Sequence, residues 1–303
     1  MKFLKSVFLI FSVTAGSFLC GSEVFDQVLP DAHAVIYVNC GRLLKDLSPE
    51  YQQFIQGAGT GSAASGTTMS MKDEMLISIK LLSPEPFALA ADGVLFSSGA
   101  AEQMQKIIAS WGGDIQKNGG TYDPSFKLGN EPADRFTIAG ESGATDLAVS
   151  KGKGSRKLFR LRCGTIFPVS TPLGIPRKCA VSELLRQHQA GMVFLIASPG
   201  KLAATLAGVP AYAAFSGILN QLEYACLQIN GKAQFLELKL HVRALSSESA
   251  AMLHSMLQPL LQQKIFLSGS SSVCTGKEIS LEAKFDLAAL ANIKNMSDMQ
   301  KKE

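Results

Sequence analysis

Strict alternation of apolar and polar side chains makes residues 233–244 the clearest strand of the chain. The segment reads AQFLELKLHVRA, and its apolar members are Leu236, Leu238, Leu240 and Val242. Because successive side chains of a strand point to opposite faces, this set is expected to face a core while the charged residues between them face water. The pattern predicts a sheet with one buried and one solvated face.

Two further elements flank this strand. The apolar run 222–231 precedes it and ends in Asn230-Gly231, a pair that favours a tight turn between strands. We therefore predict a hairpin that turns at Asn230-Gly231. Helical spacing follows at 246–263, with a predicted buried stripe of Ala251, Leu253, Met256, Leu257, Leu260 and Leu261. Two more strands, SSSVCTG and EISLEAKF, are expected to complete this region.

Short apolar runs and helical patterns also alternate in the N-terminal half. Strands are predicted at 34–40, 87–99, 135–140, 146–151 and 156–163. Helices are predicted at 42–56, 69–82 and 100–111, the second ended by Pro84 and Pro86. The Gly- and Ser-rich segment 57–68 is expected to be a flexible loop.

One pattern occurs twice. Residues 32–47, AHAVIYVNCGRLLKDL, and residues 190–206, AGMVFLIASPGKLAATL, each contain an apolar strand, a glycine, a basic residue and a leucine that begins a helix. We predict an α+β fold of two tandem similar units, each an antiparallel sheet with helices packed on one face. The predicted divisions are a signal peptide 1–22, a first unit 23–165, a Pro-rich linker 166–182, a second unit 183–295 and a polar tail 296–303.

The first residues have the features of an export signal. Lys2 and Lys5 precede an apolar stretch at 7–19, which is shorter than the roughly 20 residues that a membrane-spanning helix needs. Cleavage as a plain signal peptide is the leading expectation, with a lipid anchor at Cys20 or a retained anchor as alternatives. Each places the remaining chain outside the cytoplasm, in the periplasm or the extracellular space.

The opening after this leader resembles a large group of uncharacterised, exported bacterial proteins. Leu29-Pro30-Asp31-Ala32 followed by AVIYVN carries the resemblance, together with the order strand, helix, hairpin and helix in the second half. The resemblance implies a signal peptide followed by a duplicated α+β body. It brings no catalytic residues.

Composition and motifs argue against several chemistries. The 303 residues are 47% apolar and 18% charged, which indicates a folded chain rather than a disordered one. No phosphate-binding loop, nucleophile elbow or paired-histidine metal motif is present. Asp31 and Asp73-Glu74 are expected at the surface. We predict no catalytic residue, metal or cofactor.

The leading functional hypothesis is an exported, non-enzymatic protein with a binding or cell-envelope structural role and an unknown ligand. One alternative is a periplasmic hydrolase whose site is assembled from distant residues. Another is binding of a polyanion or a membrane surface through residues 151–178, while nucleic acid is not expected as a partner.

The basic charge of the chain is concentrated in one segment. Residues 147–182 contain eight Lys or Arg and no Asp or Glu, whereas the whole chain has a net charge of only +4. A basic hairpin of this kind can bind phosphates or anionic head groups, or it can be a solvated edge strand. The candidate polyanion contacts are Lys151, Lys153, Arg156, Lys157, Arg160 and Arg162.

The chain contains six cysteines, of which Cys40, Cys226 and Cys274 lie in strand-like apolar runs and are expected to be buried. Cys163 and Cys179 bracket the Pro-rich segment. A disulfide between them in an oxidising compartment would contribute about 3 kcal/mol by closing this loop. We therefore predict Cys163–Cys179 as the candidate bridge.

Overall fold

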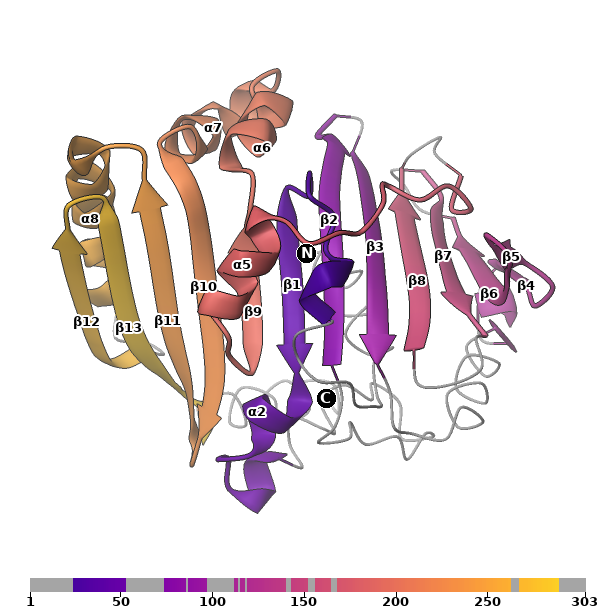
Figure 1. Cartoon of the computed structure of the whole chain (residues 1–303), viewed down its shortest axis with the longest axis horizontal. Coiled ribbons are helices and arrows are strands. Elements are labelled where there is room, and N and C mark those ends of the chain that lie inside the picture. The colour runs from indigo at the N-terminus through magenta and orange to yellow at the C-terminus, as the bar shows by residue number, and fades with distance from the viewer. Residues whose placement is uncertain are drawn as a thin grey trace, which may run out of the picture.

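The computed structural model describes residues 24–52, 74–85, 87–96, 112–113, 115–117, 119–139, 143–151, 156–164, 168–262 and 267–288. These residues form a mixed α+β fold around one large antiparallel sheet, with helices on both of its faces and at its ends (Figure 1). Among the described helices, none is both long enough and apolar enough to cross a membrane.

The sheet runs without interruption across the described chain. From one edge to the other its strands are β12 (Leu267–Thr275), β13 (Glu278–Asp286), β11 (Phe235–Ala244), β10 (Leu222–Lys232), β9 (Met192–Ile196), β1 (Ala34–Asn39), β2 (Glu74–Ser83), β3 (Ala88–Phe96), β8 (Arg156–Cys163), β7 (Thr145–Ser150), β6 (Glu131–Ile138) and β4 (Thr121–Asp123). The short β5 (Lys127–Leu128) pairs with β6. Every one of these strand pairs is antiparallel.

The helices divide between the two faces and the ends of the sheet. The described helices are η1 (Val24–Gln27), α2 (Cys40–Leu44), α5 (Ala180–Gln187), α6 (Pro199–Leu206), η2 (Pro210–Tyr212), α7 (Ala213–Leu219) and α8 (Ser247–Gln262). Figure 1 shows η1 and α5 in front of the central strands, α8 behind the strands at one edge, and α2 beneath the end of β1. The helices α6 and α7 lie at the opposite end, above β9 and β10.

The central strand β1 is apolar on both sides, as expected for a strand covered on both faces. Ile36 and Val38 join one core cluster, and Val35 and Tyr37 join a second cluster on the other face. We call the face of Val35 and Tyr37 the front face, because η1 and α5 cover it. The sheet therefore has apolar cores on both sides at its centre.

The helix predicted at 69–82 is wrong, because its described part forms the strand β2. This strand lies between β1 and β3 and pairs with both, so its apolar side chains are covered from two sides. Periodicity alone does not separate a short buried strand from a buried helix, and here the pairing partners decided the outcome.

The hairpin turn predicted at Asn230-Gly231 is also wrong. Both residues belong to β10, where they pair with Glu237 and Leu236, and the turn follows one residue later with Ala233 at a φ of 53°. The Asn230 side chain instead accepts a hydrogen bond of 2.8 Å from the backbone N–H of Gly191. The Asn-Gly pair thus supports the packing of neighbouring elements rather than the turn.

The remaining predictions for the second half are largely confirmed. The even-numbered residues of β11 face the core on the side opposite η1, and Val242 is buried there. The helix predicted at 246–263 is α8, whose Ala250 and Leu253 are buried, whereas Ala251 and Met256 of the predicted stripe are exposed. The segments 57–68 and 100–111 lie outside the described residues.

Gly231 permits close approach of α2 to the sheet, and we expect Gly231→Ala to reduce the free energy of unfolding by about 2 kcal/mol. A Cβ at this position would lie 2.2 Å from the backbone oxygen of Leu43 and 2.4 Å from Cγ of Leu47. Chemical denaturation measures the loss. The matched control is Gly217→Ala in α7, where a Cβ meets nothing within 4 Å and the free energy should stay level or rise. Equal stability of both variants would contradict this packing.

Candidate functional site

Arg160 and Arg162 of β8 point toward the front face and hold a covering segment in place. Arg162 is 1% exposed, its Nη2 lies 2.8 Å from Oδ1 of Asp92, and it donates hydrogen bonds to the carbonyl oxygens of Ala91 and Thr171. Arg160 also pairs with Asp92, at 3.4 Å. Arg162 is committed to these partners and cannot contact a polyanion without leaving them.

We call residues 168–178, which cross the front face after β8, the strap. Its backbone supplies the carbonyl groups of Ser170 and Thr171 to Arg160 and Arg162, and the N–H of Leu173 donates to Asp92 at 2.9 Å. The side chain of Leu173 packs against the front core. The predicted linker therefore includes a part of the fold that is fastened by one carboxylate and two guanidinium groups.

Among the other candidate polyanion contacts, the three that the structure describes do not form a common exposed surface. Lys151 pairs with Asp134 at 3.2 Å, and Lys157 is buried, where desolvation lowers the pKa of its ammonium group. Arg156 is exposed and donates to the side chain of Gln27 at 2.6 Å. Lys153 lies outside the described residues. The sequence pattern did not reveal that the basic side chains of β8 lie on both faces of the sheet, or that several of them contact other parts of the protein.

The predicted bridge between Cys163 and Cys179 is not formed, and both thiols are free. Cys163 packs with the core cluster of Ile36, whereas Cys179 packs with the cluster of Tyr37 on the front face. The sheet separates the two sulfur atoms. Burial raises the pKa of the Cys163 thiol. Cys40 and Cys226 are buried as predicted, and Cys274 is half-buried.

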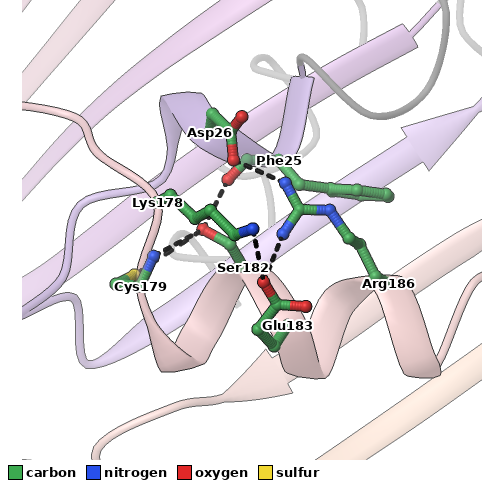
Figure 2. Close-up of polar contacts among 7 residues, drawn as sticks. All are labelled: Phe25, Asp26, Lys178, Cys179, Ser182, Glu183 and Arg186. Carbon is green, nitrogen blue, oxygen red and sulfur yellow. Dashed lines mark hydrogen bonds and ion pairs between the residues drawn. The ribbon is translucent and has the colours of Figure 1, made fainter.

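A group of polar contacts fastens η1 to α5 on the front face, as Figure 2 shows. Arg186 pairs with Asp26 at 2.5 Å and with Glu183 at 2.9 Å. The hydroxyl of Ser182 donates to the carbonyl oxygen of Phe25 at 2.8 Å. These contacts join the first described residues to the helix that begins the second half.

Glu74 is the most unusual ionisable group on this face. It was expected at the surface, yet it is 7% exposed at the start of β2. The Tyr37 hydroxyl donates to its Oε1 at 3.2 Å and the Asn39 amide donates to the same oxygen, while its buried Oε2 has no hydrogen-bond partner. Desolvation raises the pKa of Glu74, and burial beside this carboxylate raises the pKa of Tyr37.

Two histidines, one after α5 and one on β11, meet on the front face. The rings of His188 and His241 have centroids 5.0 Å apart, and Tyr224 lies 5.7 Å from His188. Desolvation lowers the pKa of both histidines, so they favour the neutral form. Within the described part of the chain, no group of three or more His, Cys, Asp or Glu is placed to hold a metal ion.

The fold and these contacts define an α+β protein whose central polar groups join its segments to one another. No family model and no curated protein matches the chain. Crystal structures of a protein called TP0453 are similar to it over 89% of this chain and 95% or 96% of theirs. Forms IV and III are 9% identical, with TM-scores of 0.42 and 0.43, and form I is 11% identical with a TM-score of 0.42. A likeness at this level carries no argument about function.

We expect Asp92→Ala to reduce the free energy of unfolding by about 3 kcal/mol, because it leaves the buried Arg162 without its carboxylate. It should also free the strap, which trypsin would then cleave faster after Arg177. Urea denaturation and limited proteolysis provide the two measurements. The control is Lys178→Gln in the same strap, where the lysine is 70% exposed and the change should stay within about 0.5 kcal/mol. Unaltered strap cleavage in Asp92→Ala would contradict this role.

Glu74 gives the stability of the protein a pH dependence. The folded chain holds this proton more tightly than the unfolded chain, so the free energy of unfolding falls as pH rises above about 4.5. Glu74→Gln removes the contribution of the Glu74 carboxyl group to this pH dependence. We expect the variant to gain stability relative to the native protein between pH 4 and pH 7.5, measured by denaturant titration. The same pH profile for Glu74→Gln and the native protein would refute the assignment.

Proposed function

We propose that this chain is an exported, non-enzymatic protein that serves as a binding or structural scaffold in the cell envelope. The basic and apolar leader at 1–22 supports export. The first described residues after it, Val24 and Phe25, are fully buried against the front face.

The observation that supports the scaffold role is that charged groups near the centre of the front face form ion pairs with one another. Asp92 pairs with Arg160 and Arg162, and Asp26 pairs with Arg186. Each pair fastens a covering segment, either the strap or η1, onto the sheet. Groups that are committed to internal partners are suited to rigidity rather than to proton transfer or to capture of an anion.

We also infer that the body is a duplication, on the basis of strand order. Outward from the central pair, one half reads β1, β2, β3, β8, β7 and the other reads β9, β10, β11, β13, β12. In both halves the fourth strand follows the fifth in the sequence, so the chain passes to the outer position first and then returns. This shared exchange of the fourth and fifth strands is stronger support for a duplication than a recurring strand and helix.

The register of the central pair supports the same inference. Ile36 pairs with Phe194, and these residues are equivalent when AVIYV is aligned with MVFLI. The remaining pairs are symmetric about this one, since Ala34 pairs with Ile196 and Val38 with Met192. An experimental structure in which β9 lies beside a strand other than β1 would contradict the duplication.

Export is tested by expressing the full chain in a bacterial host, separating the compartments and measuring the intact mass of the native protein. We expect periplasmic or extracellular material that lacks the leader, with the new N-terminus close to Ser22. Leu9→Arg places a charge inside the apolar stretch and should leave the precursor in the cytoplasm. Cys20→Ser separates the two processing routes, since only a lipid anchor depends on this thiol.

Unprocessed native protein dissolved in the cytoplasm would overturn the proposal. So would export of the Leu9→Arg variant at the native level, because the leader would then not be the signal.

A further inference from the structure

One end of the sheet has a long uncharged segment. Residues 202–222, which include most of α6 and all of η2 and α7, contain no Asp, Glu, Lys, Arg or His. Ala203, Leu206 and Leu219 from this segment are buried and hold it against the core cluster that contains Val242 and Ile279. The opposite side of these helices faces outward.

The outward side is apolar rather than polar. Its largest side chains are Tyr212, which is 41% exposed, and Phe215, which is 48% exposed. The exposed residues between and around them are alanine, glycine and proline. A surface helix normally presents charged or polar residues to water, so this composition indicates a contact with something less polar.

Other exposed apolar residues lie at the same end. Leu82, 37% exposed, belongs to the end of β2, against which α6 packs. Leu245, 52% exposed, follows β11, and its N–H donates to the carbonyl oxygen of Gln221 just after α7 at 2.8 Å. Figure 1 shows α6 and α7 beyond the ends of β9 and β10, so these two helices project from this end of the sheet. We call Leu82, Tyr212, Phe215 and Leu245 the apical surface.

The charges around the apical surface are mostly neutralised by one another. Asp31 pairs with Lys80, and Arg243 pairs with both Glu223 and Glu278. Lys201, Lys277 and Glu248 are exposed, and none of them forms an ion pair with another described residue. The surroundings therefore contain both signs, without an electrostatic preference strong enough to select a polyanion.

We propose that the apical surface docks the protein on the surface of a phospholipid bilayer, with Tyr212 and Phe215 inserted among the head groups. Aromatic side chains favour this depth because their rings are apolar and their edges tolerate water. A projecting surface fits a broad, deformable partner. Binding depends on apolar insertion, so it persists in high salt, unlike binding through a basic segment.

This inference deepens the proposed envelope role by naming its partner. Flotation of the purified protein without its leader, residues 23–303, on vesicles of phosphatidylcholine and phosphatidylglycerol measures binding at low and high salt. The double variant Tyr212→Ser with Phe215→Ser should bind at least about tenfold more weakly. The matched control is Met252→Ser with Met256→Ser on α8, where the methionines are 43% and 50% exposed and binding should be retained.

Three outcomes would overturn the proposal: no vesicle binding by the native protein, equal binding by the aromatic variant, or a loss confined to the methionine variant. A native dimer in sedimentation that the aromatic variant converts to a monomer, without vesicle binding, would assign the surface to a second copy instead. Circular dichroism and denaturant titration verify that each variant is folded. Because the vesicle assay uses purified protein, its failure leaves the result of the export experiment unaffected.

Discussion

The pairing of β1 with β9 is the contact on which the rest of the structure depends. It joins the two halves of the chain into one sheet, and its apolar side chains supply cores on both faces. All strands on either side extend outward from this pair. Loss of the pair would leave each half with an unpaired edge strand at its most apolar point, which is unfavourable because buried backbone groups require partners.

A sheet that is apolar on both faces at its centre needs a cover on each face, and the front face is covered by short segments rather than long helices. The strap, η1 and α5 each pack apolar side chains against the front core. Ion pairs and hydrogen bonds through Asp92 and Arg186 complete the attachment. Charged groups that are nearly buried are costly unless they are paired, so these residues are constrained by the fold.

The paired charges of the front face and the exposed apolar end at α6 and α7 are suited to different functions. Asp92, Arg160 and Arg162 are engaged in fastening the strap to the sheet. At the end formed by α6 and α7, the exposed side chains have no such role, and they are apolar where water would favour polar groups. The proposed scaffold and the proposed lipid contact therefore occupy different parts of the same body.

The sequence by itself determined the α+β class and the antiparallel strands β7, β8, β10, β11 and β13. These depend on local periodicity, which a stretch of residues carries without its neighbours. Only the tertiary structure decided that 74–83 is a strand, that Gly231 faces α2, that Cys163 and Cys179 lie on opposite faces, and that Arg162 and Glu74 are buried. Each of these depends on which distant segment lies alongside, because pairing and desolvation are properties of the partner as much as of the residue.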